Sequence, residues 1–121
     1  MVKNRLAKFW QLLEGKKLEQ VMFIHDWISI SFGLRSGLTI YSKITVVSNK
    51  HAVSMGEKGF RDQICGLIGK KVIDIDEDQT HFLVIFEDNS ILKFELTIPD
   101  GSTPEAAIGE IEGHHVVFFN E

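Results

Sequence analysis

The densest group of side chains that could do chemistry is the acidic run Asp74-Ile75-Asp76-Glu77-Asp78. Its alternating carboxylates match the first three ligand positions of a calcium-binding loop. Such a loop also needs a glycine at its sixth position and a bidentate glutamate at its twelfth, where this chain has Gln79 and Ile85. Two of these carboxylates could instead form a pair for acid and base catalysis. Charges this dense are more typical of a solvated turn, so we predict neither calcium binding nor catalysis here.

Other motifs with chemical potential are incomplete. The segment Gly66-Leu67-Ile68-Gly69-Lys70 partly matches a phosphate-binding loop, but its glycines are too close together and Lys71 replaces the hydroxyl residue that would hold magnesium. Cys65 is the only cysteine, which excludes an internal disulfide and a multi-thiolate metal site. The histidines lack the spacing of metal ligands; they are His25, His51, His81, His114 and His115. We therefore predict no catalytic residue, no metal and no cofactor, and expect that the protein is not an enzyme.

An internal repeat organises the chain. The stretch from Leu13 to Ser42 recurs without a gap 54 residues later, as Leu67 to Leu96. Both copies begin with Gly-Lys-Lys and continue with apolar residues at alternating positions, ending at Phe32 and Phe86. We expect one domain over residues 1–121, built from the repeats 13–42 and 67–96.

Local patterns predict a helix and three strands in each copy. Apolar residues at helical spacing indicate helices at about 3–14 and 56–68, the second preceded by a capping box of Ser54 and Glu57. Segments rich in β-branched and aromatic residues indicate strands around 17–24, 27–33, 37–47, 71–76, 81–87 and 90–97. The expected fold class is α+β, with two αβββ repeats whose antiparallel sheet or sheets carry the two main helices. In the tail, Thr103-Pro104 predicts a helix start and 116–119 a last strand.

The two copies differ on one face of their middle strand. In copy one, Ser29 and Ser31 alternate with apolar residues, which predicts a strand with one face in water. In copy two, Leu83 and Ile85 make the matching face apolar as well. Either a helix or the tail covers this second face, or it is an exposed apolar strip beside acidic residues, the composition of a protein interface.

Charge divides the chain into a basic and an acidic part. Residues 1–71 hold 12 Lys and Arg against 5 Asp and Glu, while residues 72–121 hold 1 Lys against 12 Asp and Glu. The two parts either attract each other within one fold, or the acidic part forms a surface for a basic partner. That acidic part also argues against direct nucleic-acid binding, because it repels a polyanion. No run approaches the roughly 18 apolar residues of a membrane helix, so we expect a cytoplasmic protein that does not enter membranes.

A resemblance to a known family covers about half of the chain. The residues that carry it lie in Cys65 to Asn120 and include the segments 67–72, 83–92, 104–106 and 116–119. This span resembles small uncharacterised bacterial domains related to toxin immunity proteins, including those of contact-dependent growth inhibition. The resemblance carries over no catalytic residue. It implies a protein that binds the C-terminal domain of a cognate toxin.

The resemblance and the charge together suggest a mechanism. A toxin that is a nuclease has a basic substrate-binding surface, which an acidic partner can occupy and shield from nucleic acid. We therefore expect an immunity protein that acts by occlusion. The carboxylates expected to contribute to toxin binding are Asp76, Glu77, Asp78, Glu87 and Asp88, extended by Glu105, Glu110 and Glu112. The alternative is a scaffold or small-molecule-binding module whose pocket is lined by residues such as Trp27, Phe82 and Phe94.

Overall fold

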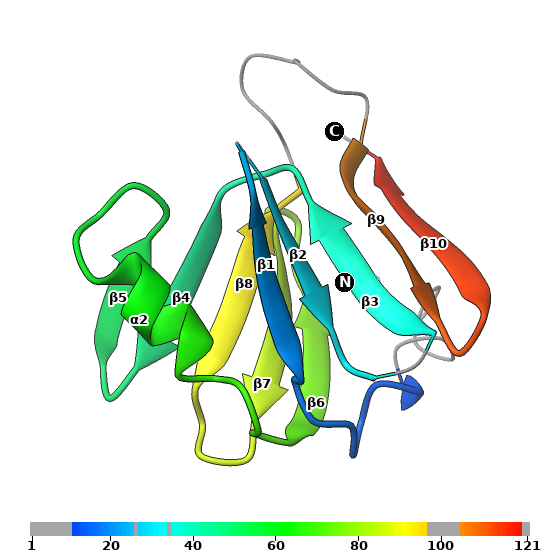
Figure 1. Ribbon diagram of the computed structural model, residues 1–121, viewed down its shortest axis with the longest axis horizontal. Coiled ribbons are helices and arrows are strands. Elements are labelled where there is room, and N and C mark those ends of the chain that lie inside the picture. The colour runs from blue at the N-terminus through cyan, green and yellow to red at the C-terminus, as the bar shows by residue number, and fades with distance from the viewer. Residues whose placement is uncertain (1–10, 26, 34, 97–104, 120–121) are drawn as a thin grey trace.

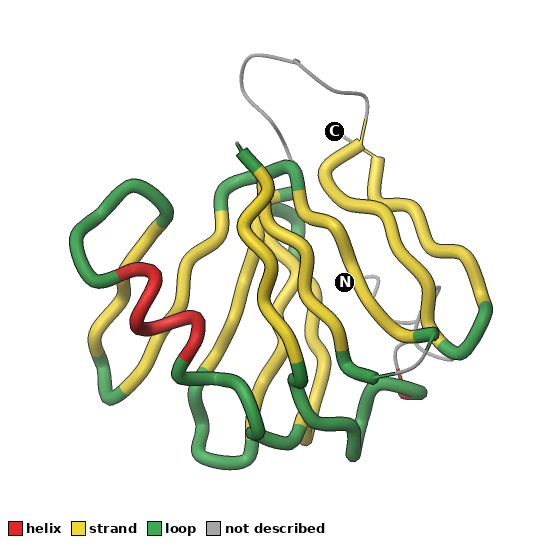
Figure 2. The backbone as a smooth tube through the Cα atoms, viewed as in Figure 1, coloured by secondary structure: helices red, strands yellow, loops and turns green. Residues whose placement is uncertain are grey.

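The described part of the chain is mostly β-structure. The computed structural model describes residues 11–25, 27–33, 35–96 and 105–119. Strands make up 54% and helix 7% of the structure. Ten described strands form two five-stranded sheets, and all neighbouring strands pair antiparallel (Figures 1 and 2).

Each sheet combines strands from distant parts of the sequence. The first sheet has the order β1 (Gln20–Ile24), β2 (Trp27–Ser31), β3 (Ser36–Ile40), β9 (Glu105–Ile111), β10 (His114–Phe119). The second has the order β5 (His51–Ser54), β4 (Ile44–Ser48), β8 (Ile91–Glu95), β7 (His81–Phe86), β6 (Val72–Glu77).

The expectation of an α+β fold with two main helices is wrong. Within the described residues the helix α2 covers only Phe60–Cys65. Gly56 and Gly59, both at φ +90°, turn the chain before α2 can begin. The expected capping box closes this turn instead, since the Ser54 N–H donates to Glu57 Oε1 at 2.7 Å. Most of the helix expected at 3–14 lies outside the described residues.

Two further expectations, one of a strand and one of a helix start, differ from the structure. The segment 37–47 is not one strand: β3 ends at Ile40, and β4 begins at Ile44 in the other sheet. The helix start expected at Thr103-Pro104 lies outside the described residues, and the chain from Glu105 onward is the strand β9.

Each copy of the repeat is followed by a hairpin that joins the sheet of the other copy. Copy one forms β1, β2 and β3, and then its hairpin β4–β5 pairs with β8 of copy two. Copy two forms β6, β7 and β8, and then its hairpin β9–β10 pairs with β3 of copy one. Both hairpins have two-residue turns with positive φ at both central positions, namely Asn49-Lys50 and Glu112-Gly113. Neither sheet is therefore complete without strands from both copies.

Backbone hydrogen bonds repeat with the same 54-residue offset. Lys17 forms an antiparallel bridge with Lys71, its own equivalent in the other copy. The Leu18 N–H donates to the Lys70 carbonyl at 3.1 Å, and the Val72 N–H donates to the Lys16 carbonyl at 2.8 Å. Antiparallel pairing of equivalent residues is what an approximate two-fold axis between the copies requires.

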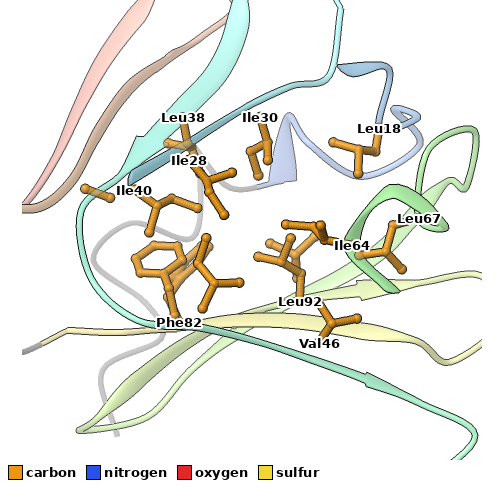
Figure 3. Close-up of a cluster of buried hydrophobic side chains, with 14 of the residues drawn as sticks. Leu18, Ile28, Ile30, Leu38, Ile40, Val46, Ile64, Leu67, Phe82 and Leu92 are labelled. Atoms are coloured by element: carbon orange, nitrogen blue, oxygen red, sulfur yellow. The ribbon is translucent and has the colours of Figure 1, made fainter. Parts of the chain in front are cut away.

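The core lies between the two sheets. Figure 3 shows Ile28, Ile30, Leu38 and Ile40 of the first sheet facing Phe82, Leu92 and Val46 of the second, with Leu18, Ile64 and Leu67 beside them. The Phe82 ring packs against the Phe94 ring with centroids 5.4 Å apart. Each such side chain contributes about 1.5–3 kcal/mol on burial, so the alternating apolar residues hold the sheets together.

Candidate partner-binding groove

The structure does not gather the eight predicted toxin-binding carboxylates into one patch. Asp76, Glu77 and Asp78 lie at the β6–β7 turn, and Glu87 and Asp88 lie at the opposite end of β7. Glu110 lies on β9 of the other sheet, and Glu112 lies in the turn that follows β9. Glu105 is the first residue of β9, and its side chain lies outside the described part.

Lysines from the earlier part of the chain contact three of these carboxylates, Lys16 and Lys70 through their side chains and Lys71 through its backbone N–H. Lys70 Nζ forms an ion pair with Asp88, and Glu87 Oε2 accepts the Lys71 N–H at 3.1 Å. Glu112 lies 2.9 Å from Lys16 Nζ. The hydrogen bond from Lys70 is the main cause that lowers the pKa of Asp88 to about 2. Part of the charge division in the sequence is therefore compensated within the fold.

The carboxylates of β6 serve the strand and its turn. Asp76 Oδ1 accepts the Glu77 N–H at 2.8 Å. Asp78 Oδ1 accepts the N–H groups of Thr80 and His81, both at 2.7 Å. These bonds, with that from Thr80 largest, lower the pKa of Asp78.

A shallow groove on the outer face of the first sheet differs from these charged turns. The strand register places Ser29 beside Thr39 and Ser31 beside Gly37. Three small side chains and a glycine thus lie together on the outer face of β2 and β3, and the groove above them has a volume of about 590 Å³. Thr39 Oγ1 donates a hydrogen bond of 3.3 Å to Ser29 Oγ, so hydroxyl groups line the floor.

Larger side chains border the groove on both sides. Met22 of β1 pairs with Ser29 and is 47% exposed, while Ile108 of β9 pairs with Thr39. At one end of the groove, Arg35 Nε lies 3.8 Å from Glu110 Oε2, with side-chain exposures of 67% and 39%. An exposed pair at this distance contributes at most about 1 kcal/mol. Both partners can therefore turn toward another molecule at little cost.

The repeat supplies an internal comparison for this groove. Leu83, Ile85, Ile91 and Lys93 of the second sheet correspond to Ser29, Ser31, Gly37 and Thr39, and they pair in the same register. The second sheet thus carries large side chains where the first sheet carries small ones. Gly37 is needed where it stands, because a Cβ there would lie 2.8 Å from the Ile30 carbonyl oxygen. The strand structure does not in the same way demand small residues at positions 29 and 31, since the equivalent positions of the second sheet hold Leu83 and Ile85.

The sequence predicted only part of the groove's lining. It recognised Ser29 and Ser31 as a solvent-facing set, but it missed Thr39, Ile108 and Arg35 as lining residues. The signal for Thr39 was present, since it alternates with buried Leu38 and Ile40. Nothing in the local sequence places Ile108 beside β3.

The structure does not form the small-molecule pocket that the alternative hypothesis placed at Trp27, Phe82 and Phe94. Phe82 and Phe94 are fully buried against each other in the core, whereas Trp27 lines a separate cleft beside α2. Among the described residues, no group of three or more His, Cys, Asp or Glu side chains is placed to hold a metal ion. The described helix is also too short and too polar to cross a membrane.

Comparison of the chain with protein-family models, with curated proteins and with solved structures finds no match.

Proposed function

We propose that this protein is an immunity protein that binds a cognate toxin domain through the groove of the first sheet and blocks the toxin without catalysis. The toxin partner is a basic nuclease domain that acts in the cytoplasm. The proposal combines the family resemblance of residues 65–120 with the site that the fold provides.

The observation that carries the proposal is the difference between two equivalent sheet faces. Small side chains at Ser29 and Ser31 leave space that Leu83 and Ile85 fill in the other copy. Small polar residues form the floor of the groove between Met22, which is exposed, and Ile108, which lines the groove. The floor leaves room for a partner side chain, and the two borders provide apolar contact area. Grooves of this composition suit a protruding segment of a protein partner.

Charge at the groove supports a basic partner. Glu110 lines the groove, and Glu112, which also pairs with Lys16 at 2.9 Å, lies in the turn that follows on the same hairpin. A lysine or arginine of the toxin can replace Arg35 as the partner of Glu110, because the existing ion pair is long and exposed. In this proposal Glu110 and Glu112 keep the toxin-binding role expected from the sequence. The carboxylates of the β6–β7 and β7–β8 turns serve the fold instead.

The test uses a variant that fills the groove with residues the fold already accepts. Ser29→Leu with Ser31→Ile copies Leu83 and Ile85 of the equivalent strand, so we expect a folded protein with an unchanged melting temperature. The toxin domain encoded by the neighbouring reading frame should co-elute with the wild-type protein and bind at nanomolar Kd. The filled variant should bind at least 100-fold more weakly and should fail to protect cells that express the toxin.

A matched control changes the outer face of the second sheet. Thr45→Val lies on β4, opposite Lys93, and should leave binding and protection unchanged. If the neighbouring protein is not toxic and does not co-elute, the immunity function is wrong. If the filled variant still binds and protects, the function stands but the groove is not its site.

A further inference from the structure

A second cleft lies between the β1–β2 hairpin and the loop that leads into α2, away from the groove. Its volume is about 450 Å³, which suits a small organic molecule. The apolar part of its lining consists of Phe23, Trp27, Ile28, Met55 and Phe60. The lining comes from both halves of the fold, because β1 and β2 belong to the first sheet, whereas α2 packs on β4 and β5 of the second. Figure 1 shows α2 beside β4 and β5.

The aromatic lining is held in place by neighbouring rings and by the core. Phe60 is buried, and Trp27 packs edge-on against Tyr41 with ring centroids 5.4 Å apart. Arg61 Cζ lies 4.8 Å from the centroid of the Phe23 ring, within the range of a cation–π contact. This contact orients the guanidinium at the cleft.

The charged groups of the cleft have both signs. Arg61 forms no ion pair within the described part of the chain, so its guanidinium can pair with a carboxylate. Glu57 and Asp62 also line the cleft, as does His25. Glu57 Oε1 accepts the Ser54 N–H, which fixes that side chain. An apolar cleft bordered by one cation and two carboxylates complements a molecule with an apolar body, one carboxylate and one ammonium group.

We infer that this cleft binds a free amino acid with a large apolar side chain. The side chain enters between Phe23, Trp27 and Phe60. Arg61 binds the α-carboxylate, and Asp62 with Glu57 binds the α-ammonium group. A simple anion would pair only with Arg61, and a simple cation only with Asp62 and Glu57. Both charges of the ligand are therefore needed for affinity.

Matched probes test the inference. In a Trp10→Phe background, where Trp27 is the only tryptophan, phenylalanine should change the Trp27 emission with a sub-millimolar Kd. Phenylalaninamide lacks the carboxylate and N-acetylphenylalanine lacks the ammonium group, and each should bind at least tenfold more weakly. Arg61→Gln should weaken phenylalanine binding tenfold and leave the amide unchanged. Asp62→Asn should weaken phenylalanine but not the N-acetyl compound.

Three results would overturn the inference. The first is that phenylalanine and leucine produce no saturable signal up to 10 mM, in fluorescence and in NMR shift mapping alike. The second is equal binding of phenylalanine and its N-acetyl derivative, which would show that the carboxylates of the cleft contribute nothing. The third is equal binding of phenylalanine and its amide. Melting curves of each variant show whether it is folded.

Discussion

Carboxylates in the second half of the chain stabilise turns by accepting backbone N–H groups. Asp78 accepts the N–H groups of Thr80 and His81, and Asp88 accepts that of Ser90 at 3.0 Å. Aspartate suits these positions because its short side chain reaches the backbone two or three residues ahead. A carboxylate that already accepts such local hydrogen bonds has fewer free oxygen lone pairs for a partner protein than its charge suggests.

Asp88 should make the stability of the protein depend on pH. Its pKa lies near 2 when folded, against 3.8 normally, mainly because of the hydrogen bond from Lys70. A lowered folded pKa contributes stability above about pH 4, and this contribution disappears as the pH falls toward 2. Asp88→Asn keeps an acceptor for the Ser90 N–H and loses the ion pair. We expect it to lower the free energy of unfolding by about 0.5–1 kcal/mol at pH 7, because the pair is partly exposed.

Urea unfolding of the two proteins at several pH values measures this difference. The difference in unfolding free energy between the wild type and Asp88→Asn should shrink between pH 4 and pH 2 and vanish near pH 2. Lys70→Gln should cost a similar amount at pH 7, and the double variant should cost no more than either single change. A constant difference between pH 7 and pH 2 would rule out the ion pair as its source.

At the level of single elements, β6 is notable because it is an edge strand. It lies at the end of the second sheet, and among the described strands only β7 pairs with it, so alternate backbone N–H groups have no partner in a described strand. The N–H groups of Ile75 and Glu77 donate instead to the carboxylates of Asp74 and Asp76, each at 2.8 Å. The charged side chains also repel the carbonyl groups of an approaching strand. This edge is therefore protected against pairing with a second molecule.

Removing both protecting carboxylates should expose this edge. Asp74→Thr with Asp76→Thr keeps a strand-forming sequence but removes the charges and most of the N–H capping. In analytical ultracentrifugation at about 100 μM, we expect the variant to associate and the wild-type protein to sediment as a single species. Asp74→Asn with Asp76→Asn retains oxygen acceptors and should associate less. A threonine variant that sediments like the wild type would show that β6 needs no such protection.

At the level of the whole molecule, local patterns predicted the strands of the repeat but not their partners. The alternation in Ile28–Phe32 and Phe82–Phe86 identified β2 and β7, since a half-buried strand has a period of two residues. The pattern from 37 to 47 shows no break, although the chain changes sheet at Tyr41–Lys43. The exchange of hairpins is a long-range arrangement, so it leaves no local signal. For the same reason the β9 side of the groove was beyond prediction.

The exchanged hairpins should make the protein unfold in one step. Each sheet holds strands from both copies, so neither copy can unfold without leaving the other sheet incomplete. Val84 is fully buried in β7 of the second sheet, and Val84→Ala should cost about 1–3 kcal/mol. Trp27 lies in the first sheet and Val84 in the second, yet the emission of Trp27 should report the full loss of unfolding free energy. In a Trp10→Phe background, urea midpoints from Trp27 emission and from far-UV circular dichroism should shift together. If the Trp27 midpoint stays in place while the dichroism midpoint falls, the two sheets unfold separately, and the exchange does not couple them.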